Sequence, residues 1–302
     1  MVDHSIKGKT VLITGGGGFV GSHLAEGLRA LGYTVTVIDS HFDSYTRERL
    51  QGVRLIEATI DGGSLRGALE GGMDMVIHGA ALTTPPDLMG VTLFAHVRRN
   101  VDLLIDCLDQ SALHDVPYFV FLSSSGVFSF EEAEELHEDV FPRGASAYAV
   151  AKRAGEALCA AYPGSLVVRL GPLYGADERS RDSRVFVSPI RRWLDCLDQG
   201  TPITVESPLS RRDWTYLPDL ARAIDRLASR GARGLFHLTS GEILGDLELA
   251  EFIAALRPGT SVAIAERPEP RRVPMTSRRT ELDGFAWTPL ARGLSLVAEG
   301  HA

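Results

Sequence analysis

The sequence has few cysteines, and none of them forms a recognisable pattern. Its 302 residues include only Cys107, Cys159 and Cys196, which are widely spaced and lie in apolar, helix-like stretches. Such spacing gives neither a disulfide framework nor a set of metal ligands. We therefore expect no metal site, and we expect these thiols to be small core residues in a reducing compartment.

The sequence also lacks an excess of positive charge and any long apolar run. The net charge of −8 argues against nucleic acid as the main partner, because nucleic-acid-binding proteins need clustered positive charge. The N-terminal residues MVDHSIKGKT contain no apolar segment of a secretion signal. No apolar run approaches the roughly 18–20 residues that a membrane-spanning helix needs. The sequence thus predicts a cytoplasmic protein without a membrane or nucleic-acid partner.

The first half of the chain alternates short apolar runs with helical patterns. Strands are predicted at residues 9–15, 34–39, 53–58, 73–80, 118–125 and 165–170. Helices are predicted at residues 18–32, 63–71, 88–111 and 147–161. Nearly all-apolar strands that alternate with helices indicate a parallel sheet covered on both faces. The predicted fold class is α/β, with a Rossmann-type doubly wound parallel sheet followed by a smaller mixed α/β C-terminal lobe.

A glycine-rich turn joins the first predicted strand to the first predicted helix. Residues 14–21, TGGGGFVG, place glycines at positions 15, 18 and 21. Glycines at this spacing allow a tight turn, a close backbone approach to a pyrophosphate and close packing of the helix on the sheet. The helix N-terminus then offers unpaired N–H groups to the phosphates. A plain loop could have the same composition, but its place between strand and helix favours a dinucleotide site.

Asp39 ends the second predicted strand, roughly 20 residues after Gly18, where a carboxylate can accept both hydroxyls of an adenosine ribose. It would repel a 2′-phosphate, and no arginine follows it directly, so NAD is favoured over NADP. An aspartate that starts a turn is the simpler alternative.

Small and hydroxyl-bearing residues follow two further predicted strands, in the segments IHGAA (77–81) and LSSSGVF (122–128). In a parallel sheet, ligands bind beyond the carboxyl ends of the strands. One of the three consecutive serines is therefore placed to reach a substrate beside a nicotinamide. His78 by itself is typical of a buried core histidine.

Tyr148 and Lys152 lie in the segment SAYAVAK at positions i and i+4, on one face of a predicted helix. Alone, such a pair is common on ordinary helices. Together with the features above, it resembles the short-chain dehydrogenase/reductase superfamily, and more closely its extended branch, the NAD-dependent epimerase/dehydratase family. The matching segments, from about Thr14 to Ala223, are TGGGGFVG, IHGAA, RRNVDLL, SSSGVF, YAVAK, RLGPLYG and RRDWTYLPDLARA, together with Asp39.

The resemblance implies an NAD-dependent oxidoreductase that moves a hydride between nicotinamide and a hydroxyl or keto carbon of a sugar or sugar-derived substrate. Tyr148 would be the acid/base. Lys152 would hold the nicotinamide ribose and, with the positive ring, lower the pKa of the Tyr148 phenol. Ser124 would bond the same substrate oxygen. The alternatives are a nucleotide-sugar epimerase, similar to UDP-glucose 4-epimerase, that retains its NAD, and a non-catalytic NAD-binding regulator.

The family pattern also implies two sets of binding residues. The cofactor set is Gly15, Gly18, Phe19, Val20, Gly21, Asp39, Ser40, Thr59, Ile60, Gly79, Ala80, Ala81, Asn100, Leu122, Ser123, Tyr148, Lys152, Gly171 and Leu173. The substrate set is Ser124, Ser125, Thr83, Arg212 and Arg272. Asn100 fits a solvated position on a long helix equally well. Arg212 matches the arginine of an R-D-[FYW] motif that grips substrate phosphates in nucleotide-sugar enzymes, a task suited to a guanidinium.

By the same resemblance, residues 1–170 would form the NAD-binding Rossmann domain, with residues 212–242 returning to it. Residues 171–302 would mostly form the substrate-binding lobe. The polar stretch GADERSRDSR (175–184) is expected to be a mobile loop over the site. Relatives often dimerise through helices equivalent to 88–111 and 147–161, which implies a homodimer.

Three residues depart from the family pattern. Pro172 stands where nucleotide-sugar epimerases usually have an asparagine that contacts substrate phosphate, and proline has neither an amide side chain nor an N–H. Thr59 replaces an aspartate near the adenine. Ser125 and Gly126 stand where 4,6-dehydratases carry an acidic pair, which argues against dehydration.

Overall fold

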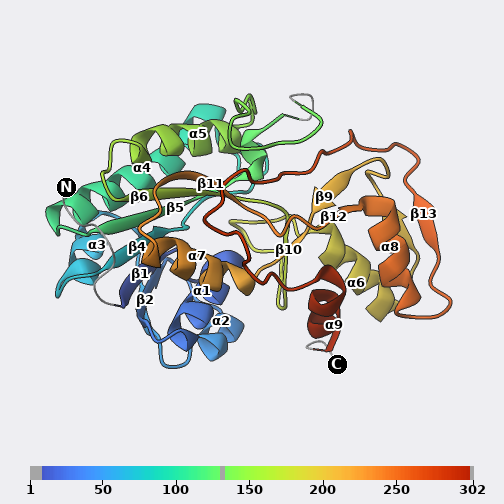
Figure 1. Ribbon diagram of the computed structural model, residues 1–302, viewed down its shortest axis with the longest axis horizontal. Coiled ribbons are helices and arrows are strands. Elements are labelled where there is room, and N and C mark those ends of the chain that lie inside the picture. The colour runs from blue at the N-terminus through green and yellow to red at the C-terminus, as the bar shows by residue number, and fades with distance from the viewer. Residues whose placement is uncertain (1–8, 130–132, 300–302) are drawn as a thin grey trace.

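A computed structural model describes residues 9–129 and 133–299 of the chain (Figure 1). At its centre is a seven-stranded sheet with the strand order β11-β6-β5-β4-β1-β2-β3, in which all neighbours are parallel. The strands are β1 Thr10–Thr14, β2 Thr34–Asp39, β3 Arg54–Glu57, β4 Met75–His78, β5 Tyr118–Ser124, β6 Ser165–Leu170 and β11 Gly234–Leu238. The direction of winding reverses between β1 and β4, and ligands bind at such a switch point. The predicted Rossmann-type fold is confirmed.

Helices cover both faces of this sheet, and Figure 1 shows α3, α4 and α5 on one face and α1, α2 and α7 on the other. They are α1 Phe19–Ala30, α2 Ser44–Arg49, α3 Gly62–Leu69, α4 Leu93–Leu113, α5 Ala147–Cys159 and α7 Asp219–Ser229. Side chains alternate along each strand, so Val11 and Ile13 pack into the core beneath α1 and α7, while Leu12 packs into the core beneath α3 and α4. Burial of both faces explains why the strands are almost entirely apolar.

A smaller lobe with its own apolar core lies beside the carboxyl ends of the strands, to the right in Figure 1. Its helices are α6 Pro189–Gln199, α8 Asp246–Ala255 and α9 Leu290–Glu299. Its strand pairs are β8 Ile203–Val205 with β13 Val262–Ile264, and β9 Arg211–Asp213 with β12 Ile243–Gly245. The pair β7 Leu173–Tyr174 and β10 Thr215–Tyr216 connects this lobe to the main sheet. Trp193, Leu249 and Leu294 are central to the lobe's core.

The element boundaries differ from the predicted ones at a few places. The helix predicted from Leu88 begins only at Leu93, because the Thr92 hydroxyl accepts a hydrogen bond from the Ala95 N–H and caps it there. Within the first half of the chain, α2 was not predicted, and it is short and polar. After building part of the smaller lobe, the chain returns to the main sheet as β11, whose His237 lies opposite Arg169 of β6. Within the described ranges, no helix combines the length and apolarity needed to cross a membrane.

Candidate active site

The turn after β1 requires glycine at two positions. Gly15 has φ +75°, and a Cβ added there would lie 2.6 Å from the backbone nitrogen of Ala80. A Cβ on Gly21 would lie 2.1 Å from the carbonyl oxygen of Gly15. Gly18 is the N-cap of α1 and offers no side chain to its first turn, so the N–H groups there are left for a ligand. The turn therefore has the shape and the free N–H groups that binding the phosphates of a dinucleotide requires.

Asp39 lies across from this turn, at the end of β2. Its Oδ2 accepts a hydrogen bond from the Gly17 N–H at 2.9 Å, and its Oδ1 accepts one from the Ser40 N–H at 2.7 Å. These bonds fix the carboxylate at the edge of the glycine turn, and each oxygen keeps lone-pair capacity for a ribose hydroxyl. The arrangement fits the adenosine ribose of NAD.

The structure brings Tyr148, Lys152 and Ser124 together. The Ser146 hydroxyl accepts the Ala149 N–H at 3.1 Å and starts α5 directly before Tyr148. The buried Lys152 ammonium donates to the Leu122 carbonyl at 2.7 Å and lies 5.6 Å from the centroid of the Tyr148 ring. A Cβ on Gly126 would lie 3.3 Å from Ser124 Oγ and 3.5 Å from the Tyr148 ring, so both groups border the same space.

Burial is the largest influence on the protonation of Tyr148 and Lys152. Burial raises the pKa of the Tyr148 phenol above its usual value, while a hydrogen bond with Ser124 and the positive charge of Arg184 oppose this rise. Burial also lowers the Lys152 pKa to about 8, against the charges of Cys159 and Glu156, which raise it. In the protein alone, the groups that lower the pKa of the phenol are Ser124 and Arg184, and the expected effect of Lys152 together with the nicotinamide ring stays a prediction. Desolvation outweighs the favourable interactions, and the Lys152 ammonium is directed at a backbone carbonyl.

Two cavities meet at Tyr148. The cofactor cavity contains the glycine turn, Gly79 and Ala81 after β4, and Lys152. The substrate cavity contains Ser124, Ser125 and Arg212. Six residues line both cavities: Phe19, Val20, Ser123, Tyr148, Leu170 and Arg184. A phenol at this junction can contact a molecule in each cavity at the same time.

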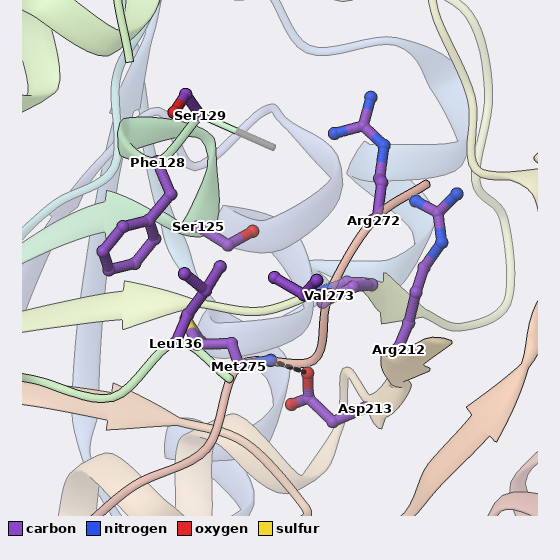
Figure 2. Close-up of a pocket in the computed structure, with 10 residues that line it drawn as sticks. Ser125, Phe128, Ser129, Leu136, Arg212, Asp213, Arg272, Val273 and Met275 are labelled. Atoms are coloured by element: carbon purple, nitrogen blue, oxygen red, sulfur yellow. Dashed lines mark hydrogen bonds between the residues drawn. The ribbon is translucent and has the colours of Figure 1, made fainter. Parts of the chain in front are cut away.

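Figure 2 shows a further pocket that adjoins the substrate cavity and shares Ser125, Pro172 and Arg212 with it. The guanidinium groups of Arg212 and Arg272 lie on one side of this pocket, and Phe128, Leu136 and Met275 lie on the other. The carboxylate of Asp246 holds Arg212, with an Nη2–Oδ2 distance of 2.7 Å. Two guanidinium groups side by side are an arrangement suited to an anion.

Asp213 lies at the base of the same pocket, where its Oδ1 accepts the Met275 N–H at 3.3 Å. Burial raises the pKa of this carboxyl to about 7, and a hydrogen bond with Thr239 works in the opposite direction.

The other predicted residues fall into three groups. Phe19, Val20, Thr83, Leu122 and Ser123 line the cofactor cavity, so Thr83 lies with the cofactor residues rather than with the substrate residues. Gly171 and Leu173 line the substrate cavity instead of the cofactor cavity. Asp39, Ser40, Thr59, Ile60 and Ala80 are not among the residues that line either cavity in the described parts of the chain.

Asn100 supports the cofactor cavity from outside. Its Oδ1 accepts the Leu82 N–H at 2.9 Å, and its Nδ2 donates to the Leu82 carbonyl at 3.3 Å. It thereby fixes the segment that follows β4. His78 is a core residue, as the simpler interpretation held, and its Nδ1 lies 2.9 Å from the Thr14 hydroxyl.

The sequence analysis did not identify the arginines of the segment 175–188, hereafter the arginine segment. Arg179, Arg181 and Arg184 all line the cofactor cavity. Arg181 contacts the Gly17 carbonyl, and its Nη2 lies 2.9 Å from Asp43 Oδ2. At the other side of the cavity, the Ser183 carbonyl accepts the Thr83 N–H at 3.0 Å. The segment was expected to lie over the site, and its three closely spaced arginines were the sequence signal for an anionic ligand.

Comparison with known proteins places the chain in a family. Residues 11–238 match the model of the NAD dependent epimerase/dehydratase family, and the chain belongs to this family. It is therefore an NAD-dependent enzyme of the extended short-chain dehydrogenase/reductase type, as the sequence predicted. Among the described residues, no group of three or more His, Cys, Asp or Glu side chains is arranged to hold a metal ion.

Several relatives are similar over nearly the whole chain. A dTDP-4-dehydro-6-deoxy-D-allose reductase from Streptomyces bikiniensis is 29% identical over 322 residues, covering 96% of this chain and 95% of the relative. The UDP-glucose 4-epimerase of Corynebacterium glutamicum is 25% identical and covers 96% and 93% of the two chains.

Two solved structures show the shared fold. The structure of MoeE5 in complex with UDP-glucose and NAD is 27% identical, with a TM-score of 0.77 and coverage of 97% and 98%. A UDP-glucose 4-epimerase from Thermotoga maritima, solved with UDP-glucose, is 21% identical, with a TM-score of 0.80 and the same coverage.

Proposed function

We propose that this protein catalyses NAD-dependent hydride transfer at a hydroxyl- or keto-bearing carbon of a nucleotide sugar. The observation that carries the proposal is the position of Tyr148 and Arg184 at the junction of the cofactor and substrate cavities. A proton-transferring group at such a junction can act on a substrate carbon that faces the nicotinamide.

Each residue of the site has a separate role in the proposed reaction. When bound, NAD accepts or supplies the hydride, held by the glycine turn, the first turn of α1 and Asp39. Tyr148 takes the proton from the substrate hydroxyl in oxidation and returns it in reduction. Ser124 donates a hydrogen bond to the same substrate oxygen as its charge develops. Lys152, held by the Leu122 carbonyl, is placed to bond the nicotinamide ribose with its remaining N–H groups.

The substrate class follows from the charge and polarity of the second cavity. Arg212 and Arg272 can bind the two phosphates of a nucleoside diphosphate, and the sugar would then extend toward Tyr148. Trp214 Nε1 is buried without a hydrogen-bond partner in the described chain, and Trp214 lines the substrate cavity. Pro172 borders the same space and contributes no donor, so phosphate binding there depends on the two arginines.

The main form of the proposal is a net oxidoreductase, and a specific observation also favours an epimerase. The arginine segment spans the cofactor cavity from Gly17 to Thr83, which suits an enzyme that retains its NAD through the reaction. The relatives include both reductases and epimerases. Mixing the purified protein with NAD or NADH and a panel of nucleotide sugars separates the two. Stoichiometric change in NADH absorbance indicates a net oxidoreductase, whereas an isomerised sugar without that change indicates an epimerase.

The catalytic role of Tyr148 is tested by Tyr148→Phe. We expect turnover to fall by about 10²–10⁴-fold while NAD binding, measured by calorimetry, is retained. Tyr45→Phe, at an exposed tyrosine outside both cavities, is the matched control and should keep full turnover. Unchanged turnover in Tyr148→Phe would show that the phenol is not the acid/base and would favour the non-catalytic NAD-binding regulator.

We also propose a cytoplasmic homodimer. The exposed side of α4 carries Leu93, Phe94 and Ile105, and Phe94 is 81% exposed. Exposed large apolar side chains on one helix mark an interaction surface. The described cysteines are free thiols, which agrees with a reducing compartment. Light scattering tests the dimer, and Phe94→Glu should yield a monomer if α4 is the interface.

A further inference from the structure

Arg184 occupies an unusual place in the active site. It lies in the arginine segment, far from α5 in sequence, yet it lines both cavities together with Tyr148. Its Cζ lies 5.1 Å from the centroid of the Phe19 ring, at the first turn of α1. A fixed positive charge therefore stands where the two cavities meet.

A buried carboxylate holds Arg184 from behind. Glu178 is only 4% exposed and contacts Nη2 of Arg184. The N–H of Ser188, 2.9 Å from Glu178 Oε1, and the Ser188 hydroxyl, 2.5 Å from Oε2, fix this carboxylate in turn. Glu178 lines neither cavity, so it anchors the guanidinium without facing the phenol. In contrast, Nη1 of Arg184 is buried and has no hydrogen-bond partner in the described chain.

The other charged and titratable groups near Tyr148 are bonded to other partners or are uncharged. On α5, the Lys152 ammonium is bonded to the Leu122 carbonyl, and Glu156 lies one turn further on. On β4, burial and the charge of Lys152 lower the His78 pKa to about 3, so this ring is neutral. On β9, the carboxylate of Asp246 holds Arg212. The positive charge of Arg184 lowers the pKa of the Tyr148 phenol and so favours its ionised form.

We propose that Arg184 is a positioning residue that stabilises the phenolate form of Tyr148, and that Glu178 fixes the guanidinium for this purpose. In the family pattern this task falls to the lysine one turn along the helix. Here the lysine is engaged by a backbone carbonyl, and a permanently charged guanidinium from another segment takes its place. The positive charge of Arg184 opposes the rise in the phenol's pKa that burial causes. The inference rests on the proposed function only for the role of Tyr148 as acid/base.

The test is a titration of the phenol that does not depend on turnover. The protein is labelled with tyrosine carrying ¹³C at Cζ and studied as the NAD-loaded full chain, and Tyr148→Phe identifies the resonance of Tyr148. In Arg184→Gln, the pH midpoint at which this resonance titrates should rise by roughly one unit, because the positive charge that favours the phenolate has been removed. Arg184→Lys should restore part of the shift, because it returns a positive charge to the same position.

A matched control separates Arg184 from positive charge in general. Arg181→Gln removes an equal charge from the same segment, at a guanidinium paired with Asp43. Its midpoint should shift by less than half as much. The proposal is overturned if Arg184→Gln, folded by circular dichroism, keeps the native midpoint, or if Arg181→Gln shifts it equally.

The pH dependence of kcat/KM supplies a second measurement. Loss of Arg184 should move the acidic limb of this profile to higher pH, by the same number of pH units as the titration midpoint of the Tyr148 resonance. If Tyr148→Phe proves fully active while the Arg184→Gln titration still shifts, the electrostatic pair exists and the proposed catalytic role fails. If the titration does not shift while Tyr148→Phe is inactive, the proposed function stands and this inference fails.

Discussion

The guanidinium of Arg169 donates hydrogen bonds to both carboxylate oxygens of Glu156, with Nε–Oε1 at 2.8 Å and Nη2–Oε2 at 2.7 Å. The Ser123 hydroxyl donates to the same Oε1 at 2.6 Å. The two charged side chains are only 3% and 14% exposed. Glu156 lies on α5 two turns after Tyr148, and its partners lie on β6 and β5. The ion pair thus ties the helix that carries Tyr148 to the strands that border the two cavities.

We predict that Glu156→Ala lowers the free energy of unfolding by about 3–5 kcal/mol, because it leaves the Arg169 charge buried without a partner. Urea unfolding measures this loss. The control is Asp102→Ala, which breaks the Arg98–Asp102 pair of 3.4 Å, whose side chains are 82% and 59% exposed. An exposed pair contributes at most about 1 kcal/mol. Equal losses in the two variants would mean that the buried pair does not anchor α5.

The sequence was sufficient to predict the central sheet and the glycine turn, because these follow from local patterns. Strand burial leaves an apolar run, and the turn after β1 needs glycine where a Cβ would collide with Ala80. Tyr148 and Lys152 could be predicted to lie on one helix face because their spacing is set within a single helix. Asp39 could be predicted to lie at the glycine turn because its distance along the chain from the turn is fixed by one strand-helix-strand unit.

The contacts of Arg184 and the protonation of Tyr148 could not be predicted in the same way. Arg184 reaches the site through the path of a segment without regular structure, and no periodicity encodes that path. The pKa of the phenol depends on how completely the folded cavity removes water, which is a property of tertiary packing. For the same reason, Gly171 and Leu173 were assigned to the cofactor although they line the substrate cavity.

A second prediction concerns the pH dependence of stability. The folded-state pKa of Lys152 is about 8, below the usual value of 10.5. Between these values the folded protein binds fewer protons than the unfolded chain, so the free energy of unfolding rises with pH. The charged lysine therefore opposes folding below about pH 8, and this penalty disappears toward pH 10.5. In Lys152→Met this pH-dependent penalty is absent, because a methionine side chain does not titrate.

The difference in unfolding free energy between the native protein and Lys152→Met should therefore shift by about 2 kcal/mol in favour of the native protein from pH 7 to pH 10. Urea unfolding at the two pH values measures it. A pH-independent difference for Lys152→Met would contradict the depressed pKa.

A third prediction concerns the choice of dinucleotide. Asp39→Asn keeps one carbonyl oxygen for the Gly17 N–H but removes the charge that accepts ribose hydroxyls and repels a 2′-phosphate. We expect NAD to bind about 10-fold more weakly and NADP to bind more tightly than it does to the native protein, as measured by calorimetry. Asp43→Asn is the control. Its carboxylate pairs with Arg181, whereas the carboxylate of Asp39 is bonded to the Gly17 N–H of the glycine turn. Equal losses of NAD affinity in both variants would argue against ribose recognition by Asp39.

The last prediction tests phosphate binding with two neighbouring arginines. Arg272 lines the pocket beside Arg212, and burial followed by the like charge of Arg212 lowers its pKa. A bound anion relieves this repulsion, so Arg272 should contribute to the binding of a nucleoside diphosphate. Arg271 is its matched control, because it points to Glu134 at the surface and lines none of these cavities.

In the NAD-loaded protein, Arg272→Gln should weaken the binding of UDP by about 10-fold or more, since a charge-assisted hydrogen bond to phosphate is worth roughly 1.5–3 kcal/mol. Arg271→Gln should change the affinity by less than about 2-fold, because exposed charges are screened by solvent. Calorimetry at two salt concentrations measures both, and the loss in Arg272→Gln should be larger at the lower one. If the two variants weaken binding equally, the pair of guanidinium groups in Figure 2 does not form the phosphate site, and the sugar must be held without them.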